Sequence, residues 1–451
     1  MYLKENNEGV IVLKSLNRFA SVFSSVILLS TLIACSSSEE PSAGTGNSDK
    51  QKKAVTIQYT FWGDAATKAT HERLVDNFNK KNTGVTVKAI HVPAFDQYLQ
   101  KVQTTMASGT APDVINFVHN DVYAFASRDV LVDLTEWIKR DWDGAKLGEN
   151  LGDLMEGMKY EGKQYALPRN AGGWYTYYNK TLFDKAGVKY PDESWTWETL
   201  VAEGKKLSNN SANVNERTWA IAFDAKATAQ HINYMWQAGG DYFNEDKSAL
   251  LFDSPKTKQG LQFMYDLMYK DKIAPDPSIT SIQKPVDLFS SGQLAMYQDS
   301  MGNIVRFTGA KDLNWGIAYL PKGPENRFGR IGATGLAIPE GSKNKEAAWE
   351  FIKYVNGNEG QEILAKDGFS APVREQLLQD ESKFLPADKF PIDRNVAIKG
   401  YQEYGKLLPS HKNWTQIEAV AKKYLDLYFI NSMSLDEATK KIMDEATPLL
   451  K

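Results

Sequence analysis

Short strand-like segments alternate with helix-like segments along most of the chain, and this alternation constrains the fold more than any other feature. Apolar and polar residues alternate at 55–59 and 85–89, and residues 114–118 are almost continuously apolar, as in buried strands. Residues 74–78 and 99–106 carry apolar side chains at the spacing of a helix. Strands that alternate with helices predict crossover connections and largely parallel sheets covered on both faces.

A second block of the same kind begins at Trp174. The chain has 451 residues, which is too long for one ordinary domain and predicts two or three. The pattern predicts strands over 174–178, 294–298 and 315–319, and helices over 197–207, 228–238, 256–269, 347–355 and from 416 onward. We therefore predict an α/β protein with more than one lobe and a helical C-terminal tail.

The N-terminus has the pattern of a secretory address. Lys4, Lys14 and Arg18 precede an apolar run, 19–34, that is shorter than the ~20 residues a spanning helix needs. The run ends in Leu-Ile-Ala-Cys35, which resembles the bacterial lipobox. This predicts a signal peptide over 1–34 and a lipid on the thiol of Cys35. The alternative is an uncleaved anchor with a chance cysteine.

Residues 36–53 contain Ser, Gly, Pro and charged residues but no large apolar side chain, so we expect 35–53 to be a lipidated cysteine followed by a flexible linker. The protein would then be anchored to the extracellular face of the cytoplasmic membrane, in a Gram-positive cell.

Cys35 is also the only cysteine, so the body can form no disulfide, thiolate zinc site or cysteine nucleophile. The five histidines form no close ligand pair, and we expect neither a metal nor a cofactor. The net charge of −3 and the lack of a basic run argue against nucleic acid as a partner.

Several segments, in order, resemble the extracellular solute-binding proteins of sugar ABC importers, the maltose-binding group. These segments are Tyr59–Asp64, Met106–Val114, Tyr165–Pro168 with Tyr177–Lys180, Phe289–Met296, and Gly332–Ile338 with Ser342–Ala348. The resemblance covers nearly all of residues 54–451. It implies a two-lobed fold of the periplasmic-binding-protein type II kind, with discontinuous lobes, a hinge and a ligand cleft.

On this resemblance we place 54–168 plus 296–320 in lobe 1 and 169–295 plus 321–451 in lobe 2. The chain would cross between the lobes near 168–172, 295–297 and 319–323. A cleft at this position agrees with the rule that ligands of open α/β sheets lie beyond the carboxyl ends of the strands.

Polar and aromatic residues at these strand ends are candidates for the site. Asp64, to which the resemblance assigns contacts with sugar hydroxyls, could equally cap the next helix. Asn120 and Asp121 follow the strand 114–118 and could bind hydroxyls or simply form a turn. Trp62 and Trp174 could stack on a sugar ring, although Trp174 could also be a core residue.

Four further residues are candidates for the site on less direct grounds. Arg169 lies at the first proposed crossing, and Asp299 follows the strand 294–298. Trp236 lies on a helical pattern that favours a core position. Trp414 is the best match to the stacking aromatic that the maltose-binding group has in its helical tail.

The expected function is therefore the extracytoplasmic capture of a mono- or oligosaccharide by a monomer, which delivers it to ABC permease subunits. The first alternative is the same fold binding another solute, such as a polyamine, phosphate ester, peptide or iron carrier. The second is a carbohydrate-active enzyme with two carboxylates. No GxSxG, P-loop, GxGxxG or HExxH motif occurs, so we expect no catalysis. A surface adhesin without an importer is the last alternative.

Overall fold

The computed structural model describes residues 54–451 apart from 142–151, 212, 214, 215, 224–227, 367 and 369. The predicted signal peptide, Cys35 and the linker lie outside the described residues. From residue 54 onward the chain belongs to one compact unit. Within the described residues, no helix combines the length and apolar character needed to span a membrane.

The first sheet has five strands in the order β2-β1-β3-β12-β6. The bounds are β1 Val55–Trp62, β2 Val85–Val92, β3 Val114–Val118, β6 Leu167–Gly172 and β12 Gly332–Ala337. The first three strands are parallel, whereas β12 runs antiparallel to both β3 and β6. The sheet is therefore mixed, and the prediction of largely parallel pairing holds only for its N-terminal strands.

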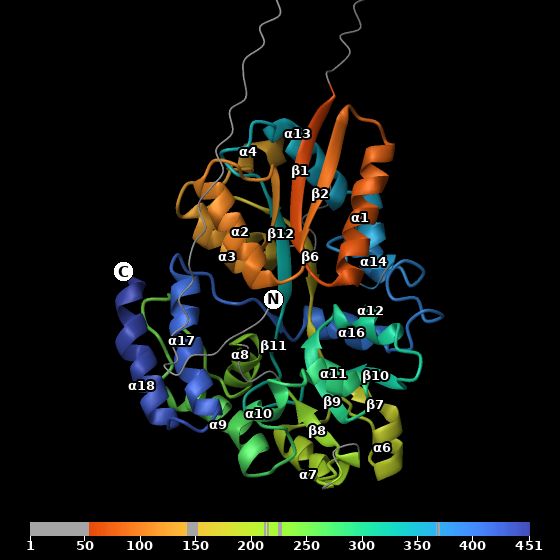
Figure 1. The fold of residues 1–451 in the computed structure, drawn as a ribbon, viewed down its shortest axis with the longest axis vertical. Helices are drawn as coiled ribbons and strands as arrows, with labels where there is room; N and C mark the ends of the chain where they lie inside the picture. The colour runs from red at the N-terminus through yellow and green to blue at the C-terminus, as the bar shows by residue number, and fades with distance from the viewer. Residues whose placement is uncertain are drawn as a thin grey trace, which may run out of the picture. The chain divides into compact units, whose positions relative to one another are not determined.

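Helices from distant parts of the chain cover this sheet. The N-terminal ones are α1 Ala65–Lys80, α2 Phe95–Ala107 and α3 His119–Ala126. Two later helices, α13 Lys345–Asn356 and α14 Asn358–Lys366, pack against α1, and α14 lies beside it in Figure 1. The apolar stripe of α13 is buried in the same core as the apolar side of β1, which explains why these segments meet.

The second sheet has four strands in the order β10-β7-β9-β8. Their bounds are β7 Trp174–Asn179, β8 Trp219–Ala222, β9 Leu294–Ser300 and β10 Trp315–Ala318. Only β8 and β9 are parallel; β7 runs antiparallel to both of its neighbours. The helices in this region include α7 Trp197–Leu207, α8 Thr228–Gln237 and α9 Pro255–Tyr269, close to the ranges that the sequence predicts.

The strand pairing corrects the predicted lobe boundaries. Residues 296–320 contribute β9 and β10 to the second sheet rather than to lobe 1, and β12, within 321–451, belongs to the first sheet. No crossing occurs at 295–297, because β9 continues within one sheet. The periodicity of a strand shows that it is buried but does not show which sheet it joins.

The observed crossings lie at three other places. The chain leaves the first sheet at Gly173, between β6 and β7, one residue beyond the predicted range. It returns between β10 and β12 through the short strand β11 Gly329–Arg330, later than the predicted 319–323. It reaches the second sheet again between α15 Glu375–Gln379 and α16 Arg394–Gln402, because α16 packs against β7 and β10.

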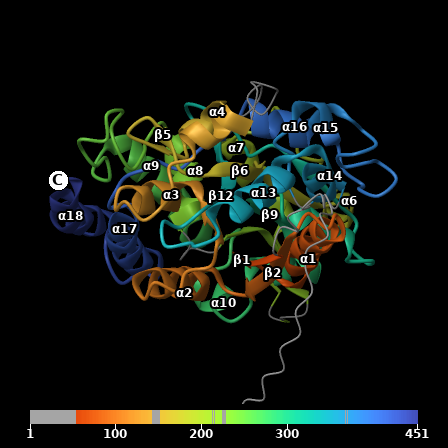
Figure 2. The same ribbon diagram turned by 90° about the horizontal axis from the view of Figure 1, so that it is seen from above.

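The C-terminal segment is helical, as predicted. Helices α17 Trp414–Phe429 and α18 Leu435–Ala446 pack side by side, as both ribbon views show (Figure 1 and Figure 2). Helix α17 also contacts α8 of the second lobe and α3 of the first. This placement brings the tail to the region where the two lobes meet.

Candidate functional site

The first lobe contributes the beginning of α3 to the site. Strand β3 ends at Val118, and α3 starts immediately with His119, Asn120 and Asp121, all of which are buried. The Nε2 of His119 lies 3.1 Å from the carbonyl oxygen of Leu408, which connects this turn to the segment before α17. The amide oxygen of Asn120 is buried and has no hydrogen-bond partner among the described residues. Such an acceptor is costly when left unsatisfied, so this turn is suited to a ligand donor.

The second lobe contributes the end of β9 and the first turns of α8. Asp299 is half-buried; it accepts from the backbone N–H of Ser300 at 2.6 Å and from the hydroxyl of Tyr297. The amide nitrogen of Gln230 donates to the carbonyl of Gln298 at 3.4 Å, one residue before Asp299. The amide oxygen of Gln230 is a second buried acceptor without a partner in the described chain.

Arg330 connects these two sides. It lies on β11, in the crossing segment, and its backbone N–H donates to the side chain of Asn233 on α8 at 2.7 Å. Its guanidinium interacts electrostatically with Glu418, Asp299 and Asp121. No protein partner for its Nε is found in the described residues. The four charged side chains come from α3, β9, β11 and α17, and we call them the charged cluster.

Burial governs the ionisation of the charged cluster. Burial and the neighbouring Glu418 raise the pKa of Asp121 to about 7, against a smaller opposing effect of Arg330. Burial also raises the pKa of Asp299, although its bonds from Tyr297 and Ser300 oppose the shift. Burial lowers the pKa of Arg330, and the carboxylates oppose this shift because they favour the charged guanidinium. A desolvated cluster of this kind is typical of ligand sites.

Trp236 is buried on α8 near the charged cluster, as the helical pattern predicts. Its ring is covered by the Nζ of Lys406 at 4.8 Å, and Lys406 pairs with Asp241 at 2.7 Å. The indole N–H of Trp236 has no acceptor in the described part of the chain. Lys406 occupies the position over the ring, so stacking of a sugar there would require Lys406 to move.

Trp62 is the last residue of β1, and Asp64 follows two residues later. Both are distant in sequence from the members of the charged cluster. Asp64 is the N-cap of α1 and accepts from the backbone N–H and the hydroxyl of Thr67, each at 2.9 Å. The cap interpretation is therefore confirmed, and the exposed carboxylate retains acceptor capacity for a ligand. Trp62 is half-buried and packs against Phe95 and Tyr98, with ring centroids at 4.9 and 5.0 Å.

The structure places two predicted residues in the core instead of the site. Arg169 is buried within the first lobe, where its guanidinium lies 3.3 Å from both Asn116 and His71 and donates to Thr334 at 2.9 Å. Trp414 is 1% exposed and packs against Tyr242, with ring centroids 5.2 Å apart. The contacts of Arg169 and Trp414 cover the surfaces that a ligand would need. Trp414 is buried because the first turn of α17 faces the core of the second lobe.

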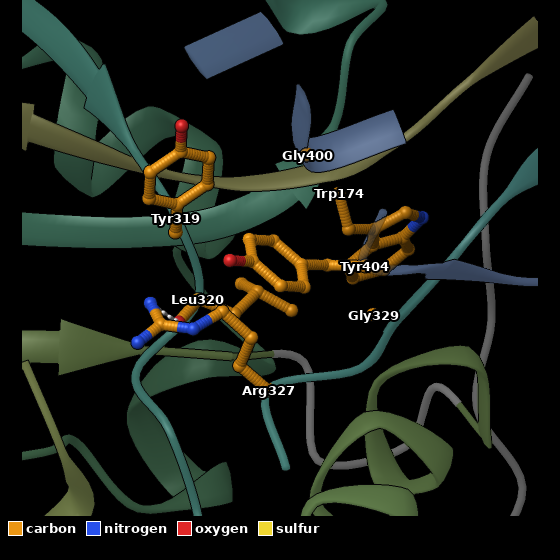
Figure 3. A pocket seen from close by; sticks show the side chains of 7 residues that line it. All are labelled: Trp174, Tyr319, Leu320, Arg327, Gly329, Gly400 and Tyr404. Atoms are coloured by element: carbon orange, nitrogen blue, oxygen red, sulfur yellow. Dashed lines mark hydrogen bonds between the residues drawn. The ribbon is translucent and has the colours of Figure 1, made fainter. Parts of the chain in front are cut away.

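Trp174 lines a small pocket at the crossing segments. The pocket wall also includes Tyr319, Leu320, Arg327, Gly329, Gly400 and Tyr404 (Figure 3). The guanidinium of Arg327 lies 5.2 Å from the ring of Tyr404 and hydrogen-bonds the backbone of Glu193. The carboxylate of Glu193 accepts from Lys399 at 2.8 Å and from Tyr404 at 2.6 Å. Trp174 thus belongs to the joint between the lobes.

Two members of the charged cluster, Arg330 and Glu418, are absent from the sequence predictions. Arg330 lies on a two-residue strand that gives no periodic signal. Glu418 is three residues before Ala421 and seven before Leu425, both buried, so it interrupts the apolar stripe of α17. A carboxylate on an apolar stripe is a signal that sequence analysis could have used.

The arrangement defines a two-lobed binding protein. Its charged cluster offers acceptors and a guanidinium donor between the lobes. Among the described residues, no group of three or more His, Cys, Asp or Glu side chains is arranged to hold a metal ion.

Comparison with known proteins specifies the class. The sequence pattern of the bacterial extracellular solute-binding proteins matches residues 59–362. The chain belongs to this family, and it is a solute-binding component of an ABC transporter. The resemblance to the maltose-binding group and the two-lobed fold predicted from it are confirmed.

Three relatives illustrate the likeness. An ABC substrate-binding protein of Listeria monocytogenes, solved in complex with cycloalternan, superposes with a TM-score of 0.81 at 27% identity, covering 88% of this chain and 99% of the other. A binding protein of Brucella abortus (strain 2308) is 25% identical over 84% of this chain and 89% of its own. The maltotriose-binding protein of Pyrococcus abyssi (strain GE5 / Orsay) is 26% identical over 62% of this chain and 58% of its own.

Proposed function

We propose that this protein binds a mono- or oligosaccharide between its lobes and delivers it to an ABC permease. The observation that carries the proposal is the charged cluster, which four separate segments assemble where the lobes meet. A sugar presents a rim of hydroxyls, each of which both donates and accepts a hydrogen bond. Asp121, Asp299 and Glu418 supply acceptors, and the Nε of Arg330 supplies a donor.

Relatives that bind sugars support this choice of ligand. The Listeria monocytogenes relative was solved with cycloalternan, and a relative in Halalkalibacterium halodurans, 26% identical over 47% of this chain, is an arabinooligosaccharide-binding protein. Trp62 is the aromatic candidate for the apolar face of a ring, because the ring of Trp236 is buried beneath Lys406. Asp64 remains a proposed contact at the end of β1.

The test is a ligand screen by thermal shift over neutral mono- and oligosaccharides, followed by calorimetry on the best one. A ligand at 100 times its Kd should stabilise the protein by about 2.7 kcal/mol. Asp121→Asn and Asp299→Asn should each weaken binding by roughly tenfold to hundredfold, because a sugar hydroxyl loses a charged acceptor. Glu437→Gln, on the exposed side of α18, is the matched control. If neither Asp variant changes the affinity, the charged cluster is not the site.

The proposal extends to the membrane. A lipid on Cys35 would hold a monomer at the outer face of the cytoplasmic membrane of a Gram-positive cell, with 36–53 as the tether. Cys35→Ser should release the protein from the membrane fraction into the medium. A variant that fractionates with the membrane as the parent does would contradict the lipid anchor.

We also propose that the protein binds its sugar without chemical change. Prolonged incubation with the sugar found in the screen should return it intact by chromatography. Catalytic turnover, with product that scales with protein concentration, would support the carbohydrate-active enzyme instead.

A further inference from the structure

Helix α3 of the first lobe presents two side chains to the second lobe. His119 and Tyr123 are four residues apart and therefore lie on the same face of the helix. The Nε2 of His119 lies 3.1 Å from the carbonyl oxygen of Leu408, whose side chain is buried in the core of the second lobe. The ring centroid of Tyr123 lies 5.9 Å from the Nζ of Lys247, which belongs to a loop of the same lobe. This face of α3 is therefore a contact between the two lobes.

The first lobe fixes the ring of Tyr123. The side chain is half-buried and packs edge to face against Tyr160, with ring centroids 5.0 Å apart. Tyr160 packs in turn against the core of the first lobe. Because the ring is already fixed by these neighbours, its contact with a cation costs little additional side-chain entropy.

The loop that carries Lys247 is held by its own hydrogen bonds. Its ends, Phe243 and Leu250, pair through a β-bridge and are buried in the core of the second lobe. The side chain of Asn244 accepts from the backbone N–H of Ala249 at 2.9 Å. Lys247 has a φ of 60°, an uncommon left-handed conformation for a lysine, and its backbone N–H donates to the carbonyl of Asn244 at 3.1 Å. Backbone strain of this kind is concentrated at ligand clamps and switch regions.

The contact lies on the helix that begins with proposed ligand residues. Asn120 and Asp121 lie between His119 and Tyr123 in the sequence of α3. If the second lobe moves away from this face of α3, the ring of Tyr123 loses the ammonium group of Lys247. Separation of the lobes therefore breaks the contact, whereas closure restores it.

We propose, on the basis of the proposed function, that Tyr123 and Lys247 form a clasp that holds the lobes closed on the bound sugar and slows its release. The closed arrangement is the one in which these two side chains touch. A cation over an aromatic ring at a partly exposed site stabilises the contact by about a two- to fivefold change in equilibrium. Because the contact exists only in the closed arrangement, it should lower the rate of dissociation and leave the rate of association nearly unchanged.

Stopped-flow measurements of sugar release test the clasp. The probe is whichever of glucose, maltose, maltotriose and cellobiose binds most tightly by calorimetry. Lys247→Met removes the charge and keeps an apolar stem, and Tyr123→Leu removes the ring; each should raise the dissociation rate by about two- to fivefold. The double variant should release the sugar no faster than either single variant, since each substitution removes the same contact.

A matched lysine of the second lobe provides the control. Lys272 is exposed, has a similar φ of 56° and precedes Ile273, which is buried in the core of the second lobe. Lys272→Met should therefore release the sugar at the rate of the parent. Circular dichroism and denaturant titration establish that every variant is folded and measure its free energy of unfolding.

Energy transfer between two dyes follows the lobes without requiring a sugar. The dyes are attached at Asp76→Cys on α1 and Lys206→Cys on α7, both exposed positions, in the complete chain with Cys35→Ser, so that no other thiol reacts. The fraction of molecules in the closed arrangement should fall in Lys247→Met and should match that of the parent in Lys272→Met.

The outcomes separate the clasp from the proposed function. If a sugar binds and both variants release it at the rate of the parent, the clasp is refuted and the sugar-binding function stands. If no sugar binds, the proposed function fails and energy transfer alone decides: a lower closed fraction in Lys247→Met supports the clasp, and an identical distribution overturns it. If the variants lower the free energy of unfolding without changing the release rate, the contact is a fixed part of the fold and the inference is wrong.

Discussion

Replacing Arg330 by glutamine should destabilise the protein in a way that depends on pH. The guanidinium of Arg330 interacts electrostatically with Asp121, Asp299 and Glu418 and lowers the pKa of both aspartates. Removing one partner of a buried charge group typically costs about 3–5 kcal/mol, because the remaining charges are left uncompensated. We expect a loss of this size at about pH 8.5, which is above the pKa of Asp121 in the folded parent.

The loss should be smaller in acid. The pKa of Asp121 in the folded state is raised from 3.8 to about 7, so Asp121 is already protonated at about pH 5.5 and has no charge interaction with Arg330 to lose. Ionising this buried carboxyl costs stability as the pH rises from about 4 to 7, and Arg330 limits that cost. In Arg330→Gln the pKa rises further, and each additional unit corresponds to about 1.4 kcal/mol of further loss above pH 7.

Urea unfolding at both pH values measures the two losses. The difference in unfolding free energy between parent and Arg330→Gln should be at least about 1.4 kcal/mol larger at the higher pH. Arg306→Gln is the control, because Arg306 forms an exposed pair with Asp287 and should have a small effect at either pH. Equal losses at both pH values would refute the electrostatic account of the charged cluster.

Substitutions at three further positions test individual contacts. Asp64→Ala should cost about 1 kcal/mol of unfolding free energy by denaturant titration, whereas Asp64→Ser should retain the helix cap; equal stability of the two variants would contradict the capping role. Trp414→Ala should lower the free energy of unfolding by about 3–5 kcal/mol, since the ring is buried. The folded fraction should bind sugar as the parent does, and a reduced affinity would indicate that Trp414 contacts the ligand. Glu193→Gln weakens the bonds from Lys399 and Tyr404 and should speed hydrogen exchange over residues 319–331; unchanged exchange would show that this contact does not restrain the crossing.

Local sequence patterns were sufficient to predict the elements whose structure depends mainly on their own residues. Alternation at Val55, Ile57 and Tyr59 marks β1 because those side chains face one core. The order of motifs was enough to indicate the family and the two-lobed fold. Asn120, Asp121 and Asp299 were predicted as site residues because ligands of open α/β sheets lie beyond the carboxyl ends of the strands.

Local pattern failed where the environment of a side chain depends on distant segments. Arg169 was a candidate because it lies at the first proposed crossing, yet its guanidinium donates to Thr334, a residue 165 positions away. Trp414 precedes a helix, as a stacking aromatic would, but Tyr242 covers it. In both cases a partner far along the chain occupies the surface that the prediction reserved for the ligand.

The α/β class, most helices and strands, and the polar turn that begins α3 could all be predicted from local sequence patterns. Contacts between distant segments place β9 and β10 in the second sheet, return β12 to the first, and bring Arg330 and Glu418 to the proposed site. The physical reason is that periodicity reports whether a face is buried, whereas the partner that buries it is chosen by contacts between segments hundreds of residues apart.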